Sequence, residues 1–217
     1  MTHDTSNVLA RFRKPRQARS LRPAPEPWTQ ELEGVLLTAR QIRRRVHELA
    51  RVITHDYEGK ELLLVPLLTG SVVFLADLLR YLKLPLYVDF IGVSSYGSET
   101  RPGQLTFTKE PSLPFRDRHV LVIDDILDTG QTLQKVLDKL RTLRPRSLRT
   151  CVLLDKPQRR KVPIQGDYVG FQIPNAFVVG YGLDFAERYR NLPFIGVIKE
   201  TNQSSPEKTA EEKEETL

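Results

Sequence analysis

Along the middle of the chain, mostly apolar runs typical of buried strands alternate with segments whose apolar residues recur at the spacing of a helix. Ile42, Val46 and Leu49 recur at the spacing of one helical face, and the preceding Thr38 and Gln41 are typical of a capping box. The pattern predicts strands at residues 61–68, 86–93, 119–123 and 149–154, and helices with apolar stripes at 42–53, 74–82 and 133–140. Because strands that alternate with helices favour parallel βαβ units, we expect an α/β protein with a twisted, mainly parallel sheet flanked by helices.

The two ends of the chain have a different pattern from the middle. Residues 1–28 hold four prolines and little apolar periodicity, which predicts a disordered basic arm. Residues 201–217 are rich in Glu, Lys, Thr and Ser, which predicts an acidic flexible tail. From residue 167 onward, short β-like pieces are broken by Gly and Pro, so we expect an appended lobe and not a continuation of the main sheet. The domain is therefore expected at residues 29–200.

Composition narrows the class of protein. Of 217 residues, 40% are hydrophobic, and the longest apolar runs are far shorter than the roughly 20 residues of a membrane helix. The single cysteine, Cys151, excludes an internal disulfide and a cysteine-based metal cluster. No apolar segment follows the basic start, so we expect no secretory signal and a cytoplasmic protein without a membrane partner. The net charge of +6 suits either nucleic acid or phosphorylated small molecules as partners.

The segment HVLVIDDILDTGQTLQKVLDKL, residues 119–140, carries the clearest candidate chemistry. An apolar strand runs into Asp124 and Asp125, and a short loop then leads into a helix. The N–H groups at a helix N-terminus and the helix dipole favour a phosphate, and Gly130 lets the backbone approach it closely. Hydroxyls of Thr129 and Thr132 add donors. Carboxylates at the carboxyl end of a parallel strand suit hydroxyl groups or hydrated Mg²⁺, although a solvated turn with a helix cap is an alternative.

The loop is neither a P-loop nor a dinucleotide-binding loop, but it resembles a known family. VLVIDDILDTGQTL is similar to the phosphoribosyl-diphosphate (PRPP) signature of the type I phosphoribosyltransferases. Four further segments resemble the hypoxanthine-guanine members of this family. The diphosphate loop is matched by LLTGSVVFLADLLR, and the strand that leads into the lid by VDFIGVSSYGSET. The purine-binding hood is matched by LLDKPQRR followed by DYVGFQIPNAFVVGYGLDFAERYRNLPFIGVI. The resemblance covers about residues 31–200. It implies the type I phosphoribosyltransferase fold, with a small C-terminal hood built mainly from residues 156–200.

The resemblance also implies roles for individual residues. In the family, the loop that matches residues 128–132 binds the 5′-phosphate, through Asp128, Thr129, Gly130, Gln131 and Thr132 here. Asp128 also matches the general base, which takes a proton from the purine. The positions that match ribose and Mg²⁺ contacts are Asp124 and Asp125, with Asp184 as a second acid for Mg²⁺ at the purine side.

Further matched positions concern the diphosphate, the purine and the lid. Thr69, Gly70 and Arg190 match diphosphate contacts, although many family members carry Lys or Arg where this chain has Thr69. The purine contacts match Lys156, Phe177 and Val178, and the closing lid matches Ser95 and Tyr96. Without the resemblance, Lys156 reads as a surface lysine, a core position is an equal alternative for Phe177, and a simple ion pair is an alternative for Asp184 with Arg190.

Two hypotheses about function follow. The first is a Mg²⁺-dependent purine-salvage enzyme that transfers the phosphoribosyl group of PRPP to hypoxanthine or guanine and gives IMP or GMP; its family implies a homodimer or homotetramer. The second, motivated by the basic arm and the positive charge, is a nucleotide-sensing regulator of related fold that binds RNA. The motif FVVGYGLDFAERYRNLP favours the enzyme, because it resembles the purine hood.

Overall fold

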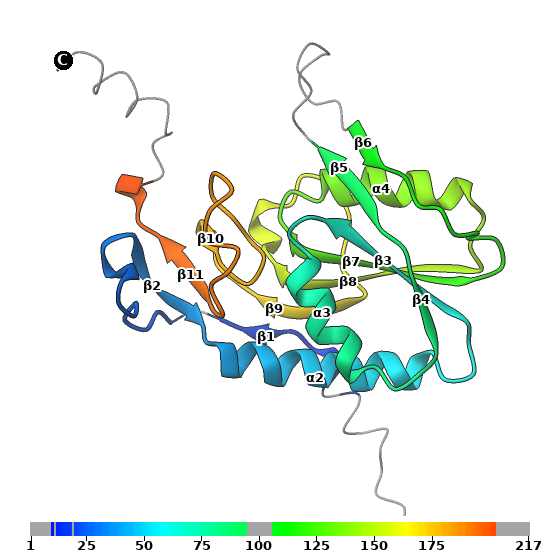
Figure 1. Cartoon of the computed structure of the whole chain (residues 1–217), viewed down its shortest axis with the longest axis horizontal. Helices are drawn as coiled ribbons and strands as arrows, with labels where there is room; N and C mark the ends of the chain where they lie inside the picture. The colour runs from blue at the N-terminus through cyan, green and yellow to red at the C-terminus, as the bar shows by residue number, and fades with distance from the viewer. Residues whose placement is uncertain (1–9, 11, 19, 95–105, 203–217) are drawn as a thin grey trace, which may run out of the picture.

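The computed structural model describes residues 10, 12–18, 20–94 and 106–202 (Figure 1). The α-helices are α2 (Ala39–Asp56), α3 (Val72–Tyr81) and α4 (Gln131–Thr142), and the short 3-10 helices are η1 (Trp28–Gln30), η2 (Pro157–Arg159) and η3 (Glu200–Asn202). The strands are β1 (Arg16–Gln17), β2 (Leu32–Leu37), β3 (Leu62–Leu68), β4 (Leu86–Val88), β5 (Ile91–Ser94), β6 (Thr106–Lys109), β7 (His119–Leu127), β8 (Ser147–Asp155), β9 (Tyr168–Gln172), β10 (Val178–Val179) and β11 (Ile195–Ile198).

The main sheet confirms the predicted α/β class. Its strand order is β1-β9-β8-β7-β3-β5-β6, with β4 also paired to β3, and every pairing except β5 with β6 is parallel. The strand β7, at the middle of the sheet, therefore has its carboxyl end between those of β3 and β8. The capping box of Thr38 and Gln41 at the start of α2 is also confirmed.

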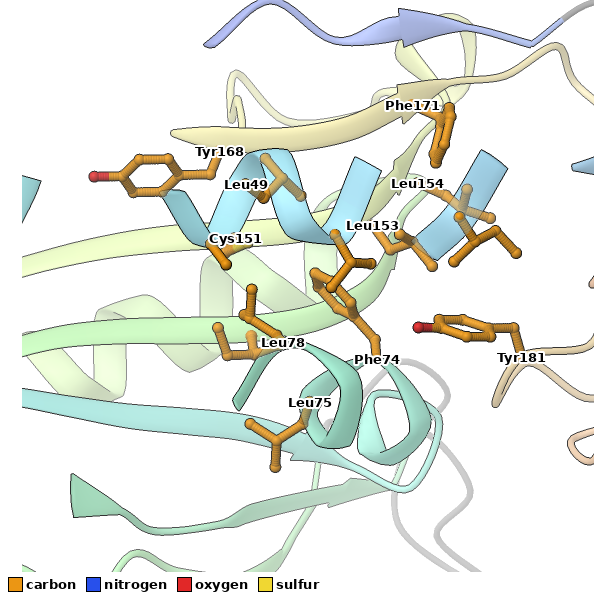
Figure 2. Close-up of a cluster of buried hydrophobic side chains, with 14 of the residues drawn as sticks. Leu49, Phe74, Leu75, Leu78, Cys151, Leu153, Leu154, Tyr168, Phe171 and Tyr181 are labelled. Carbon is orange, nitrogen blue, oxygen red and sulfur yellow. The ribbon is translucent and has the colours of Figure 1, made fainter. Parts of the chain in front are cut away.

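Side chains of β7 alternate between two hydrophobic clusters, one on each face of the sheet. Leu121 and Ile123 belong to the cluster with α2 and α3, part of which Figure 2 shows. Val120 and Val122 belong to the cluster with α4 on the opposite face. This alternation is the period-two geometry of a strand buried on both sides. It also fixes the directions in which the side chains of the next two residues of β7, Asp124 and Asp125, point.

The hood is built from other strands than the sequence predicts. A second sheet of three antiparallel strands has the order β10-β11-β2, so its third strand comes from residues 32–37 and not from the C-terminal part. The strand β9 was expected to belong to the appended lobe, but it pairs in parallel with β8 and continues the main sheet. Sequence periodicity could not reveal this arrangement, because pairing between distant strands leaves no local signal.

The prediction of a disordered arm over residues 1–28 is wrong for residues 12–18. Arg16 and Gln17 pair in parallel with β9 and form the edge of the main sheet. The buried side chain of Arg45 donates to the backbone oxygens of Phe12 and Lys14, at 2.8 Å each, and to those of Val169 and Gly170 on β9. An arginine of α2 thus fastens this part of the arm to the sheet.

One predicted strand is split in two. The run expected at residues 86–93 forms β4 and β5, with Asp89 between them. The carboxylate of Asp89 accepts hydrogen bonds from the backbone N–H groups of Phe90 and Leu113, at 2.8 and 2.7 Å, and from that of Ser112. Because these contacts turn the chain locally, the strand ladder is interrupted there.

Candidate active site

The candidate phosphate loop, residues 128–132, runs from the carboxyl end of β7 into the first two residues of α4. Gly130 adopts a φ of 81° as the residue before the helix, a conformation that favours glycine. The N–H of Gln131 donates to the hydroxyl of Thr129 at 3.4 Å. The sequence placed the end of the strand at residue 123, but it extends to Leu127, so both aspartates lie on β7 itself.

Asp124 and Asp125 lie on opposite faces at the end of β7. The Asp125 carboxylate lies against the start of α3, so close to Gly70 that a Cβ on this glycine would be 1.9 Å from its Oδ2. Burial raises the pKa of Asp124 well above its usual range, and the neighbouring Asp125 raises it further. Burial also raises the pKa of Asp125. The charge of Arg190 lowers the pKa of Asp125 in part, but burial outweighs it, so the pair resists carrying two negative charges.

A first pocket, the loop pocket, opens above this end of the sheet with a volume of about 510 Å³. The candidate residues that line it are Thr69, Gly70, Asp124, Asp125, Asp128, Thr129, Gly130, Thr132, Asp184 and Arg190. It thus brings together the residues expected for the 5′-phosphate, the ribose and the diphosphate. Gln131, which was expected to join them, is exposed and lines neither this pocket nor the next. The peptide bond between Leu68 and Thr69 is cis.

A second pocket, the hood pocket, lies between the main sheet and the hood and has a volume of about 640 Å³. Lys156, Phe177 and Val178 line it, as expected for a purine site. Its lining also includes Asp125, Ile126, Asp128 and Asp184, which line the loop pocket as well. The two pockets therefore meet at these four residues.

Lys156 and Asp128 face each other in the hood pocket. The Lys156 side chain is only 8% exposed, and its Nζ lies 3.4 Å from Oδ2 of Asp128. Burial lowers the pKa of Lys156, while the charge of Asp128 opposes this shift. The interpretation of Lys156 as an ordinary surface lysine is therefore wrong. Arg159 donates from Nε to the other carboxylate oxygen of Asp128 at 3.1 Å.

Phe177 and Val178 line the hood pocket in different ways. Val178 is buried on β10, whereas the Phe177 side chain is 43% exposed, so Phe177 is not a core residue. The ring of Phe177 lies edge-to-face with that of Phe185, with 5.4 Å between the centroids. A flat apolar face open to the pocket suits stacking with a planar ligand.

Asp184 and Arg190 form the ion pair that the sequence left as an alternative. Nη1 of Arg190 lies 2.9 Å from Oδ1 of Asp184 and also donates to the backbone oxygen of Gly182. Both residues line the loop pocket, so the ion pair does not remove them from the candidate site. Within the described residues, no group of three His, Cys, Asp or Glu side chains could hold a metal ion by itself.

Some predictions lie outside the described residues, and some site residues were missed. Ser95 and Tyr96, expected in the lid, belong to residues 95–105, which lie outside the described part. Sequence reasoning gave no role to Arg159 or Arg160, although both lie in the quoted segment LLDKPQRR. It also missed lining residues of the hood pocket that come from β2 and β11, such as Glu33 and Val197. Of these residues, only the adjacent pair Arg159 and Arg160 offered a signal in the sequence, because two basic residues stand side by side there.

Comparisons with known proteins bear on the family of the chain. The phosphoribosyl transferase domain model matches residues 34–186. The chain is 46% identical over 175 residues to a hypoxanthine-guanine phosphoribosyltransferase of Mycobacterium avium, covering 77% of this chain and 86% of that protein. It is 44% identical over 170 residues to the bifunctional protein TilS/HprT of Listeria innocua, covering 78% of this chain but only 26% of that longer protein.

A solved structure is similar as well. The hypoxanthine phosphoribosyltransferase of Staphylococcus aureus has a TM-score of 0.77 and 43% identity, and the match covers 81% of this chain and 96% of that one. These relatives support the enzyme hypothesis and give no support to the RNA-binding regulator. In the described residues, no helix is both long and apolar enough to cross a membrane. The chain belongs to the hypoxanthine-guanine phosphoribosyltransferases of the phosphoribosyl transferase domain family.

Proposed function

We propose that this protein transfers the 5-phosphoribosyl group from PRPP to hypoxanthine or guanine, which yields IMP or GMP and diphosphate. The observation that carries the proposal is the junction of the two pockets at Asp125, Ile126, Asp128 and Asp184. A sugar phosphate in the loop pocket and a purine in the hood pocket would meet beside the same carboxylates. That proximity is what the formation of a bond between the purine nitrogen and the anomeric carbon requires.

The loop pocket binds PRPP in this proposal. The loop at residues 128–132 contacts the 5′-phosphate through backbone N–H groups and through the hydroxyls of Thr129 and Thr132. Thr69, Gly70 and Arg190 contact the diphosphate. As the bond between the anomeric carbon and diphosphate breaks, the electron pair leaves with the diphosphate, and the Arg190 guanidinium stabilises the added negative charge. Ser95 and Tyr96 remain the expected lid residues, which would shield the ribosyl cation from water.

Magnesium is the expected cofactor, with Asp124, Asp125 and Asp184 as the residues that would hold it. Their carboxylate oxygens are the ligand type that Mg²⁺ prefers, and a bound cation would offset the cost of two negative charges on the buried Asp124–Asp125 pair. Since Mg²⁺ usually keeps several waters and binds substrate phosphates, a site with few protein ligands suits it. When bound, Mg²⁺ would neutralise part of the charge on the diphosphate.

The hood pocket binds the purine in this proposal. Phe177 stacks on the base, and Val178 contacts it through its backbone. Lys156 donates to the exocyclic oxygen of a 6-oxopurine and repels an amino group at the same place. Asp128 accepts the proton from the imidazole nitrogen that attacks the anomeric carbon, which makes this nitrogen a better nucleophile.

A nucleotide-formation assay with each purine, PRPP and Mg²⁺ tests the proposal. We expect product with hypoxanthine or guanine, no product with adenine, and loss of product after chelation of Mg²⁺. Asp128→Ala should lower kcat by about 10²-fold or more, the range of a lost general base, while the protein still binds IMP. Unchanged kcat in this variant would refute the role of Asp128, and absence of product in the wild type would refute the function.

Two further expectations accompany the function. The family implies a homodimer or homotetramer, which sedimentation analysis of the full chain would measure. The composition predicts a cytoplasmic protein, which fractionation of cells that produce the protein would test.

A further inference from the structure

A short segment beside the phosphate loop contacts the first three residues of the loop. We call residues 160–164 the strap; they follow η2 in the chain. None of the strap residues lines the loop pocket, whereas Leu127, Asp128, Thr129 and Gly130 all do. Its side chains and backbone reach successive residues of the loop, from the end of β7 to Gly130.

Arg160 makes the central contacts of the strap. Its Nη1 donates to the backbone oxygen of Leu127 at 2.9 Å and to that of Asp128. Its Nη2 donates to the carboxylate of Asp155, a buried residue at the end of β8. The Arg160 side chain is only 15% exposed, and such a charge-assisted contact is strong where water is excluded. One guanidinium therefore joins the loop to the neighbouring strand of the sheet.

The next contact of the strap continues this series. The backbone N–H of Lys161 donates to the backbone oxygen of Thr129 at 2.9 Å. The carbonyl groups of Leu127, Asp128 and Thr129 thus all point toward the strap. In a planar trans peptide, the carbonyl of one residue and the N–H of the next point in opposite directions. The N–H groups of Asp128, Thr129 and Gly130 therefore point away from the strap, on the side where the loop pocket opens.

Two further observations agree with this orientation. In the described part of the chain, the N–H groups of Thr129 and Gly130 donate to no backbone carbonyl. The strap also packs closely on Gly130, because a Cβ there would lie 2.5 Å from a methyl group of Ile164 and 3.0 Å from one of Val162. Rotation of the loop peptides would break the hydrogen bonds to the strap, and the methyl groups of Ile164 and Val162 block movement of Gly130 toward it.

We infer that Arg160 is a positioning residue, which directs the N–H groups of the phosphate loop at the 5′-phosphate by holding the opposite carbonyl groups. The inference rests on the proposed function, since it assigns the loop to PRPP. Arg160 touches no substrate in this proposal. Its effect reaches PRPP through the peptide groups at residues 127–129, and it fixes the backbone of Asp128, the proposed base, by the same contacts.

Steady-state kinetics of Arg160→Gln and Arg160→Lys test the inference. Gln lacks the charge and the fork of donors, so we expect a rise in the KM for PRPP of about tenfold or more, with the KM for hypoxanthine changed by less than about twofold. Lys keeps the charge but cannot bridge Asp155 and both carbonyl groups, so it should restore only part of the affinity. Affinity for IMP should fall in parallel with that for PRPP.

Arg45→Lys is the matched control. Arg45 is also buried, and it also donates to backbone carbonyl groups and to a carboxylate, but these lie on β9, the N-terminal arm and Glu48. This variant should lower the melting temperature and leave the KM for PRPP unchanged.

The outcomes separate the inference from the function on which it rests. If the wild type forms no nucleotide, the proposed function fails. If the wild type is active but Arg160→Gln keeps the KM for PRPP and loses only stability, as the control does, Arg160 has a purely structural role and the inference is overturned. Should Arg160→Gln not fold, Arg160→Lys decides, because a KM for PRPP within twofold of wild type overturns the inference as well.

Discussion

Replacement of Gly70 by Ala tests the contact between Asp125 and the Gly70 backbone, which contacts the diphosphate in the proposal, without changing any charged residue. The added Cβ would lie 1.9 Å from Oδ2 and 2.8 Å from Cγ of Asp125, and Cβ atoms in proteins essentially never come closer than 3.0 Å to another heavy atom. The carboxylate must therefore move by about 1 Å or more, because the crowding atom belongs to Asp125 itself. Gly70 has no positive φ, so alanine suits its backbone.

The expected loss of activity follows from this displacement. A misplacement of about 1 Å at a reacting site costs on the order of 10²-fold in rate. We therefore expect kcat/KM for PRPP to fall by about 10²-fold, which corresponds to about 2.7 kcal/mol. Forcing one side chain away from its preferred rotamer costs only about 1 kcal/mol, so the melting temperature should fall by a few degrees at most.

Gly166→Ala provides the matched control for the assay. A Cβ at this position would lie 2.8 Å from a methyl group of Val169, so the crowding is similar but involves no carboxylate and no residue of either pocket of the site. This variant should lose about 1–3 kcal/mol of stability and keep its kcat/KM. The reasoning would be refuted if Gly70→Ala kept kcat/KM within threefold of wild type, or lost no more activity than Gly166→Ala.

Three other changes have defined expectations. Lys156→Gln should lower kcat/KM for hypoxanthine by about tenfold or more and reduce the preference for hypoxanthine over adenine. Competition assays with the two purines measure this preference, and an unchanged preference would contradict the role of Lys156. Phe177→Ala should raise the KM for the purine severalfold with little change in melting temperature, because this side chain is 43% exposed; equal effects on the KM for PRPP would argue against stacking. Arg45→Ala should lower the free energy of unfolding by about 3 kcal/mol in urea titrations, since it leaves buried carbonyl groups and Glu48 without their partner; a loss below about 1 kcal/mol would contradict this account.

The sequence predicts those parts of the fold whose signal is local. The strands β3, β7 and β8 are apolar runs between turn residues, and α2 carries both a capping box and an apolar stripe, so their positions follow from neighbouring residues alone. The end of β7 was placed too early, because Asp124 and Asp125 resemble a turn when the partner strand is not known. Their extended conformation depends on pairing with β8, which is a property of the whole sheet.

Other parts of the fold depend on contacts between distant residues. The strand β1 has only two residues and lies in a basic, proline-rich stretch, and its partner is more than 150 positions away. Arg45 is one of several arginines in α2, and nothing in the helical pattern marks it as the buried one. The same reason explains why Arg160 was missed. Its importance comes from the carbonyl groups of Leu127 and Asp128, which are more than 30 positions away in the sequence.

The pairing of β2 with β11 has a consequence for the synthesis of the protein on the ribosome. The two strands lie near opposite ends of the described chain, so β2 must wait for its partner until almost all of the polypeptide has emerged. The central strands have their partners earlier and can assemble first. The purine pocket, which needs residues of both β2 and β11, is therefore expected to form last, and truncated nascent chains should acquire a sheet before they acquire any affinity for a base.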